Sequence, residues 1–354
     1  MTKKTSLKDI AQVVGVSTAL VSYVLNNKKE NRIGKEVAQK IRKVARELNY
    51  QPNQIAKSLK TNKTDTIGLI VADISNPFSS SLARIIEDEA DKHNYTVLFG
   101  SSDEKPQKAQ KLMTALLNRQ VDGLLICPSE GAEAHLIELQ HQGVPFVLID
   151  RYFPGLKSNY VALDNYGAIH KAVQHLIDSG FRRLGMVTFR TGLFTINERR
   201  RGYLTALKEN GITARKSWLK ELPIDVQGAD IEKAVDDLVT GPQRVDAILF
   251  ASNVLAMHGL KRINTLRLNV PDEVAVVSID EAEAYNLFHT GITYIKQPLL
   301  EIGQMSTRIL LETIKKNNST TQANLDGELI IQASTQPVVA TPSNPVVHLA
   351  EQDE

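Results

Sequence analysis

From Thr66 onward, short aliphatic runs alternate with stretches in which apolar residues recur at helical spacing. Near-continuous aliphatic runs between helices are typical of buried parallel strands, because helices cover both faces of such a sheet. Eight strands are expected, at 66–72, 95–100, 123–127, 146–149, 160–163, 183–187, 247–250 and 274–278. Eight strands exceed a sheet of ordinary size, so the pattern predicts an α/β body of two doubly wound parallel-sheet subdomains.

The charge of the chain is divided unevenly along its length. The first sixty residues carry 13 Lys and Arg against 4 Asp and Glu, a net charge of +9, whereas the remaining residues carry 29 against 36, a net charge of −7. A basic segment on an acidic body is what a chain needs if only its N-terminal part is to approach a polyanion. Charge alone leaves a solubilising basic face as an equal alternative.

The basic segment carries the signals of two short helices. Ser6 and Asp9 form a capping-box pattern, and the apolar residues after them recur at helical spacing as far as Gly15. Ser17 can then cap a second helix. Two short helices joined by a turn that contains glycine predict a helix-turn-helix. A third helix at 35–49 is expected to complete a small all-α core.

One face of the second helix is suited to the major groove of DNA. Its residues lie at helical spacing opposite the apolar Val21 and Val24. They are Thr18, Ala19, Ser22, Tyr23 and Asn26. Hydroxyl and amide groups can bond to base edges, a small apolar group can contact a thymine methyl, and tyrosine can reach a base or a phosphate. The alternative is an ordinary three-helix bundle with a polar exterior.

Several motifs, in a fixed order, resemble those of one known family. They are Leu7-Lys8-Asp9-Ile10-Ala11, Gly15-Val16-Ser17, Val24-Leu25-Asn26, Asn49-Tyr50-Gln51-Pro52-Asn53, Ile67-Gly68-Leu69-Ile70 and Asp73-Ile74-Ser75-Asn76-Pro77-Phe78. Through them the chain resembles the lactose and purine repressor family over nearly its whole length. The resemblance implies a sequence-specific transcriptional regulator with a helix-turn-helix headpiece and a periplasmic-binding-protein-like body that binds a small effector.

The resemblance also implies how the chain is divided. The expected parts are a DNA-binding headpiece at 1–49, a hinge helix and linker at 50–63, an effector-binding and dimerisation domain at 64–341 and a flexible tail at 342–354. Within the domain, the N-subdomain would comprise 64–161 and 294–322, and the C-subdomain 162–293 and 323–341. Several chain crossovers between the subdomains would make a hinge, with the effector in the cleft at the C-terminal ends of the strands.

In the family, the hinge helix pairs with its two-fold mate in the minor groove. The resemblance implies that Leu59 is an apolar wedge that bends the duplex, and its alternative role is in a flexible linker. The implied DNA contacts are Ser6, Ser17, Thr18, Ala19, Ser22, Tyr23, Asn26, Asn53, Ala56, Lys57 and Leu59. The family commonly has Arg at the position of Tyr23 and often Thr at that of Leu20. Because Arg suits bidentate contact with guanine, the operator should differ at the matching positions.

Polar residues at the expected strand ends are candidates for the effector site. They are Asp150, Ser252 and Asp280, joined by Arg199 and by Phe78, whose ring could stack on a ligand. Carboxylates there can accept hydrogen bonds from sugar hydroxyls or amines. Three alternatives remain: Arg199 and Asp280 only pair with each other, Phe78 is simple core, and Asp150 is a cap. Ser252 also departs from the Asn that the family often carries there.

Other classes of function find little support in the sequence. Phosphate-binding glycine motifs, a metal-ligand spacing and a defensible catalytic constellation are all missing, so we expect no cofactor, no metal and no enzymatic activity. The basic start leads into no apolar run, so a cytoplasmic protein without membrane contact is expected. Expected partners are a pseudo-palindromic operator in double-stranded DNA, a second copy of the chain and an effector that is by default a sugar or sugar phosphate. The alternative is a solute-binding protein without a DNA function.

Overall fold

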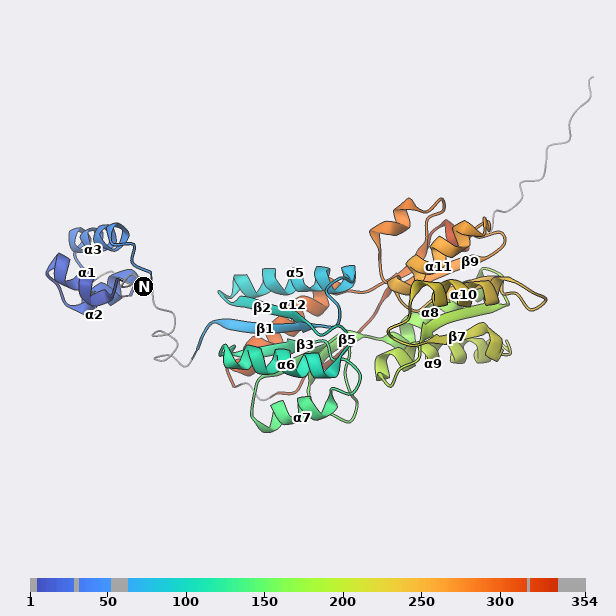
Figure 1. Cartoon of the computed structure of the whole chain (residues 1–354), viewed down its shortest axis with the longest axis horizontal. Coiled ribbons are helices and arrows are strands. Elements are labelled where there is room, and N and C mark those ends of the chain that lie inside the picture. The colour runs from blue at the N-terminus through green and yellow to red at the C-terminus, as the bar shows by residue number, and fades with distance from the viewer. Residues whose placement is uncertain (1–4, 29–31, 52–62, 317–318, 337–354) are drawn as a thin grey trace, which may run out of the picture. The chain divides into compact units, whose positions relative to one another are not determined.

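The computed structural model describes residues 5–28, 32–51, 63–316 and 319–336. The chain divides into two compact units, Met1–Thr64 and Asp65–Glu354. The first unit is all-α and the second is α/β (Figure 1). In the described part of the chain, no single helix has the length and hydropathy of a membrane span; α1 and α2 reach them only together, and the pair is bent by 108°.

The small unit contains the three predicted helices, α1 (Leu7–Val14), α2 (Thr18–Leu25) and α3 (Lys35–Glu47). The capping box is confirmed, because Ser6 accepts from the N–H of Asp9 and the Asp9 carboxylate accepts from the N–H of Ser6. Gly15 ends α1 in the left-handed region, with φ of 79°. These caps fix the turn between α1 and α2.

The helix α3 ends two residues before the predicted end at 49. Asn49 has a φ of 47°, and the N–H of Tyr50 donates to Ala45 O, which closes the last turn. The core between the three helices is small and apolar, and its most buried members are Ile10, Val21, Val24 and Ile41. A unit of this size presents most of its polar side chains to solvent.

The first sheet of the large unit is entirely parallel, in the order β11-β5-β4-β3-β1-β2. Its strands are β1 (Thr66–Val71), β2 (Thr96–Ser101), β3 (Gly123–Ile126), β4 (Phe146–Ile149), β5 (Asn159–Leu163) and β11 (Gln322–Leu325). On one face lie α5 (Pro77–Lys92) and α12 (Leu299–Ile314), and on the other α6 (Pro106–Asn118) and α7 (Glu133–His141). This layer forms the N-subdomain.

The second sheet has the order β12-β10-β9-β8-β6-β7 and is parallel except at β12. Its strands are β6 (Leu184–Phe189), β7 (Leu219–Leu222), β8 (Ala247–Phe250), β9 (Ala275–Ile279), β10 (Thr293–Lys296) and β12 (Glu328–Ile330). One face is covered by α8 (Asn165–Asp178) and α9 (Phe194–Glu209), and the other by α10 (Gly228–Val239) and α11 (Asn253–Thr265). This layer forms the C-subdomain, and the two layers confirm the predicted fold class.

All eight expected strands are present, but the body has four more. The additional strands are β7, β10, β11 and β12. Three of them are short edge strands with half-exposed residues, so they lack the continuous aliphatic run of a central strand. The strand β12 has only three residues, and a 3-10 turn follows it at Ala333–Thr335.

Three connections join the two subdomains, between β5 and α8, between β10 and α12, and between β11 and β12. They lie near residues 164, 297 and 326. The expected crossovers at 161, 293 and 322 were each placed a few residues too early, because every one of these strands continues to the edge where the subdomains meet. Each parallel strand therefore ends at that edge, which places the C-terminal ends of all the parallel strands of both sheets there.

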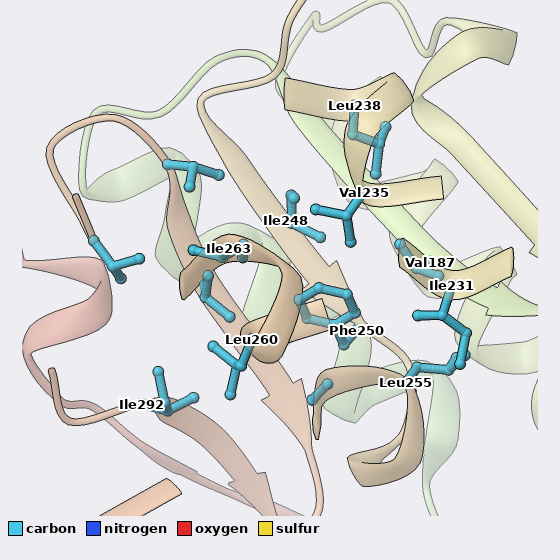
Figure 2. Close-up of a cluster of buried hydrophobic side chains, with 14 of the residues drawn as sticks. Val187, Ile231, Val235, Leu238, Ile248, Phe250, Leu255, Leu260, Ile263 and Ile292 are labelled. Carbon is cyan, nitrogen blue, oxygen red and sulfur yellow. The ribbon is translucent and has the colours of Figure 1, made fainter. Parts of the chain in front are cut away.

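A cluster of aliphatic and aromatic side chains forms the core on one face of the second sheet (Figure 2). Phe250 of β8 is fully buried at its centre, between Val235 of α10 and Leu255 of α11. On α11, Gly259 packs against the same ring: a Cβ added there would lie 2.2 Å from Phe250 Cζ. Because neighbouring atoms enclose the ring, it cannot easily move away.

We therefore predict that Gly259→Ala lowers the stability of the protein. Helix propensity alone favours alanine by about 1 kcal/mol. The overpacking of Phe250, however, should cost about 1–3 kcal/mol, so the net change should be destabilising. Urea unfolding at fixed protein concentration measures the effect. Gly155→Ala is the control, because no atom lies within 4 Å of its added Cβ, and an increase in stability for Gly259→Ala would contradict the packing argument.

Candidate functional site

The outer face of α2 has the composition expected of a surface that reads DNA. Val21 and Val24 are buried in the small core. The predicted contact residues lie on the opposite side: Thr18, Ala19, Tyr23 and Asn26 are exposed and Ser22 is half-buried. No member of this set carries a formal charge, so the face offers hydroxyl, amide, methyl and phenol groups. We define these five residues as the reading face.

Two other predicted DNA contacts, Ser6 and Ser17, are N-caps. The hydroxyl of Ser17 accepts from the N–H of Leu20 at 3.2 Å. Both serines are exposed. The hydroxyl of Ser6 donates to Asp9 Oδ2 at 2.7 Å, whereas that of Ser17 can donate its proton to an outside acceptor such as a phosphate. The remaining predicted contacts, Asn53, Ala56, Lys57 and Leu59, lie outside the described residues and stay predictions.

The neighbouring helix α3 carries several basic side chains. Lys40, Lys43 and Arg46 are exposed, and the half-buried Arg42 donates to the side chain of Asn27 at 3.1 Å. Asn27 follows the end of α2 and has a φ of 53°. Cations outside an uncharged reading face match the usual division of labour, in which phosphate contacts position the protein and base contacts choose the sequence.

In the body, the two predicted carboxylates occupy equivalent positions in the two subdomains. Asp150 directly follows β4, and Asp280 directly follows β9. Each has a left-handed backbone, with φ of 64° and 73° respectively. The N–H of Asp150 donates to Val161 O and that of Asp280 to Ile295 O, so neighbouring strands hold both conformations. Left-handed aspartates are uncommon and are typical of functional sites.

Arg199 lies on the first turns of α9 and is buried. Its Nε donates to Asn165 Oδ1 and its Nη1 to Ala251 O, both at 2.6 Å. Burial lowers the pKa of Arg199, and the carboxylates of Asp280 and Asp150 oppose that shift. Arg199 is therefore more than a partner of Asp280: it connects the start of α8 with the end of β8.

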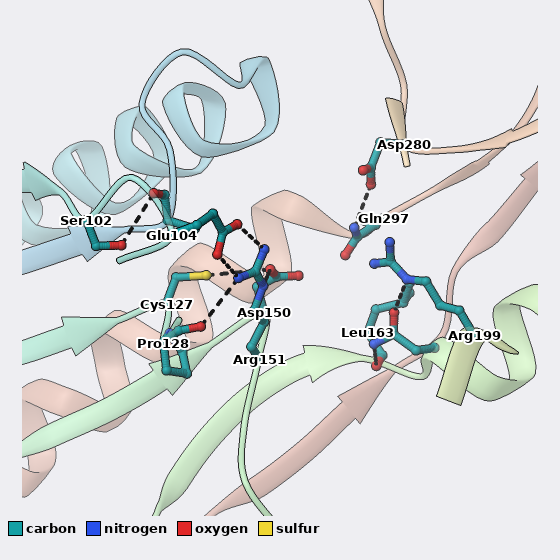
Figure 3. A network of polar contacts seen from close by, with 12 residues as sticks. Ser102, Glu104, Cys127, Pro128, Asp150, Arg151, Leu163, Arg199, Asp280 and Gln297 are labelled. Carbon is teal, nitrogen blue, oxygen red and sulfur yellow. Dashed lines mark hydrogen bonds and ion pairs between the residues drawn. The ribbon is translucent and has the colours of Figure 1, made fainter. Parts of the chain in front are cut away.

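The carboxylate of Asp280 accepts from Gln297 Nε2 at 2.6 Å (Figure 3). Burial raises the pKa of Asp280, while Arg199 and the bond from Gln297 act in the opposite direction. Asp150, from the other subdomain, adds a further upward contribution. This mutual influence shows that Asp150, Arg199 and Asp280 share one electrostatic environment although they come from two subdomains. We call the region that they bound the interdomain cleft.

A buried ion-pair network beside Asp150 was absent from the sequence prediction. Arg151 donates from Nη1 and Nη2 to the two oxygens of Glu104, both at 2.7 Å, and its Nε lies 3.5 Å from Asp150 Oδ2 (Figure 3). The thiol of Cys127 donates to Asp150 Oδ2 at 3.6 Å. Burial raises the pKa of Cys127 well above its ordinary value, so the group acts as a neutral donor. The sequence signal that could have predicted this network is the Asp150-Arg151 pair directly after a buried strand.

Besides the packing of Tyr152 on Phe194, whose ring centroids are 5.4 Å apart, two hydrogen-bonded contacts between loops of the described residues join the subdomains across the cleft, and neither was predicted. The first joins the loops after β1 and β8, where Asn253 Nδ2 donates to Asn76 Oδ1 at 2.9 Å. The second joins the loops after β3 and β6, where Glu130 accepts from Thr191 Oγ1 at 2.5 Å and from Gly192 N–H at 2.8 Å. In both sheets these loops flank the point where the strand order reverses, which is the usual ligand site of doubly wound sheets.

The other predicted effector residues border the same region. Phe78 lies on the first turn of α5 and, with Asp280 and Gln297, lines a cleft of about 830 Å³. Part of its ring surface packs on the N-subdomain core, so the core alternative also holds for this residue. The hydroxyl of Ser252 caps α11 by accepting from the N–H of Leu255 at 3.3 Å. A smaller pocket of about 110 Å³ opens beside Asn165.

Buried polar atoms without a hydrogen-bond partner gather at this edge. The described part of the chain has six such side-chain atoms, and five belong to residues at or just after the ends of strands, or to the start of α9. These five are Ser129 Oγ, Arg151 Nε, Thr188 Oγ1, Thr195 Oγ1 and Gln297 Oε1. Unpaired buried polar groups are costly, so their concentration in one place is typical of a binding site that a polar ligand completes.

A helix-turn-helix unit together with two doubly wound subdomains and a polar cleft between them defines a DNA-binding regulator with a ligand-binding body. Residues 6–53 match the family of bacterial regulatory proteins of the lacI type, and residues 64–332 match the periplasmic binding proteins and sugar binding domain of the LacI family. The chain therefore belongs to the LacI family of bacterial regulatory proteins.

Individual relatives agree with this assignment. The transcriptional repressor CytR of Escherichia coli K12 is 30% identical over 94% of this chain and 96% of its own length, and a ribose operon repressor of Halalkalibacterium halodurans is 30% identical over 94% and 97%. Among solved structures, the Lac repressor dimer bound to operator and the anti-inducer ONPF shares the fold, with a TM-score of 0.83 at 22% identity over 94% of this chain and 99% of that one.

We predict that Tyr23→Ala weakens binding to the preferred operator by about tenfold to a hundredfold, the effect of losing one good base contact. Binding to unrelated duplexes should change much less, because that binding depends on phosphate contacts. Selection from a random duplex library supplies the operator, and fluorescence anisotropy at constant salt measures both affinities. Gln39→Ala, on the exposed side of α3, is the control. Equal losses on operator and unrelated DNA would remove Tyr23 from the reading role.

Proposed function

We propose that the protein is a repressor that binds a pseudo-palindromic operator as a homodimer and that a small polar effector in the interdomain cleft controls this binding. The concentration of unpaired buried polar atoms at the cleft is the observation that carries the effector part. The DNA part is supported by the reading face on a basic unit. Two identical headpieces on a two-fold axis require two half-sites of opposite direction.

The relatives support both parts of the proposal. CytR and the ribose operon repressors are named as repressors, and the Lac repressor neighbour is a dimer on its operator. A structural neighbour of 23% identity, the transcriptional regulator CelR, was solved with cellobiose. We extend from these names that this chain also forms dimers, represses transcription and senses a carbohydrate-like molecule. We propose that the protein is located in the cytoplasm, where the bacterial DNA is, and that it has no enzymatic activity.

The proposed site residues form two sets, one that contacts DNA and one that contacts the effector. Ser6, Ser17, Lys57 and the reading face would contact the operator, with the 50–63 segment in the minor groove and Leu59 as its wedge. Phe78, Asp150, Arg199, Ser252 and Asp280 would contact the effector. Since both subdomains contribute to this second set, a ligand that bonds to both favours one angle between them. That angle would set the spacing of the two 50–63 segments in the dimer.

Arg199 is the residue whose replacement tests the coupling best. Lysine keeps the charge but cannot make the two guanidinium bonds to Asn165 and Ala251 together. We therefore expect Arg199→Lys to retain operator affinity within about threefold while the effector concentration needed for half of the response rises by at least about tenfold. The probe is the strongest stabiliser from a thermal-shift screen of sugars, sugar phosphates, nucleosides and nucleobases.

The neighbouring arginine offers a matched control. Arg200 is on the same helix, is exposed and lies 3.3 Å from Glu221 through its Nε. Arg200→Lys should leave operator binding and effector response unchanged, because lysine can keep the surface ion pair. An unchanged response in Arg199→Lys would place Arg199 outside the effector site. Lack of any DNA binding at low salt by the unmodified protein would instead favour a solute-binding protein.

A further inference from the structure

Carboxylates outnumber guanidinium groups around the interdomain cleft. Three carboxylates, those of Glu104, Asp150 and Asp280, accompany two guanidinium groups, those of Arg151 and Arg199, which leaves an excess of one negative charge. Glu130 adds another negative charge at the contact between the loops after β3 and β6. A ligand entering this cleft therefore meets a region with more acceptors than donors.

Both cations already bond to protein acceptors. Arg151 makes two parallel bonds to Glu104, a geometry in which each charge satisfies the other. Arg199 donates from Nε to Asn165 Oδ1 and from Nη1 to Ala251 O. Arg151 therefore presents no free bidentate edge, the arrangement that proteins use to bind a phosphate, whereas Arg199 keeps Nη2 and one N–H of Nη1 in the field of the Asp280 and Asp150 carboxylates.

Helix N-termini are the other common anion sites. The start of α12 lines the cleft without a side-chain cap, but its first turn carries the carboxylate of Glu301, and two other helix starts at this edge are capped. Asn76 caps α5 by accepting from the N–H of Phe78, and Ser252 caps α11. The helix α9 has no side-chain cap of its own. Just before its start, Thr191 and Gly192 donate to Glu130, which belongs to the other subdomain. The Glu130 carboxylate thus lies where an anionic ligand would otherwise find free donors.

The contact of Glu130 with this turn is close. A Cβ added at Gly192 would lie 2.8 Å from Glu130 Oε1, so a larger residue at position 192 would push the carboxylate away. The glycine thereby lets a carboxylate of one subdomain approach the backbone of the other. The Glu130 carboxylate is exposed, but it already occupies those donors and at short range repels a second anion that approaches them.

On the basis of the proposed effector function, we propose that the effector is an uncharged, hydroxyl-rich molecule and that Glu130 helps to exclude its phosphorylated form. Hydroxyls of such a ligand can donate to Asp150, Asp280 and Gln297 Oε1, and can accept from Thr195. A free sugar and the ribose of a nucleoside share this chemistry. A phosphate dianion would instead lie among carboxylates, with only the remaining N–H groups of Arg199 as a cationic partner, and Asp280 and Asp150 already compensate that charge.

Matched pairs of ligands test the ligand class. The full-length protein is titrated by calorimetry with free pentoses, hexoses, disaccharides and nucleosides, and with the phosphate ester of each. In the pair that binds, the uncharged member should bind at least about a hundredfold more tightly than its ester, and the pair identifies a sugar or a nucleoside as the source. Equal or tighter binding of the ester overturns the inference, and so does absence of binding by every uncharged member.

The same ligand separates this inference from the proposed function. If an uncharged ligand binds and its ester does not, but operator affinity is unchanged at saturation, the ligand class holds and the regulatory role fails. If an ester binds best and changes operator affinity, the regulatory role holds and the ligand class fails. Operator affinity is measured by anisotropy in the same buffer and at the same salt concentration.

Glu130→Gln tests the proposed selectivity directly. Glutamine keeps the size of the side chain and loses its charge, so the preference for the uncharged ligand over its ester should fall by about fivefold to tenfold. Affinity for the uncharged ligand should stay within about twofold. Glu133→Gln, an exposed change in the first turn of α7, is the control and should leave the ratio unchanged. An unaltered ratio in Glu130→Gln would overturn the role of Glu130, since a purely structural contact would not move it selectively.

Discussion

A buried guanidinium group at the junction of two subdomains is the interaction on which the rest of this body depends. Arg199 cannot leave water without partners, and its bonds to Asn165 and Ala251 tie the first residue of α8 to the residue after β8. Asn165 directly follows one of the three connections between the subdomains. Arg199 thereby connects the ligand-binding edge to the hinge, and a change in its environment can be transmitted as a change in the angle between the two layers.

The two subdomains use the same construction at equivalent positions, and this explains why the cleft is polar on both sides. Asp150 and Asp280 each end a buried strand in a left-handed conformation, fixed by a bond from the neighbouring strand. Asn76 and Asn253 each begin a loop-to-helix transition and bond to each other across the cleft. Because each half alone leaves carboxylate and amide groups pointing to water, the closed arrangement needs contacts or a ligand from the opposite half.

Features that depend on neighbours in the sequence were predictable, whereas contacts between residues far apart in the sequence were not. The caps at Ser6 and Ser17 and the buried aliphatic strands depend on neighbours in sequence, so they were expected correctly. The same holds for the positions of Asp150 and Asp280 after their strands. In contrast, the contact of Glu130 with Gly192 and the pair of Arg151 with Glu104 join residues that are 62 and 47 positions apart. Their partners are determined by strand order, which periodicity alone cannot supply. The prediction missed the short edge strands for a related reason, since half-exposed residues give only a weak hydrophobic pattern.

The separation of charge along the chain gains a physical role from this arrangement. The headpiece carries exposed cations on α3 and an uncharged reading face on α2, so cations supply affinity for any duplex and uncharged side chains supply sequence choice. At the cleft of the body both guanidinium groups bond to protein acceptors and carboxylates are in excess, so the protein does not attract polyanions to its ligand site. Coupling between the two must then pass through conformation and not through long-range fields, because salt screens exposed charges beyond about 8–10 Å. A conformational coupling is reciprocal: whatever an effector does to operator affinity, the operator must do to effector affinity by the same factor.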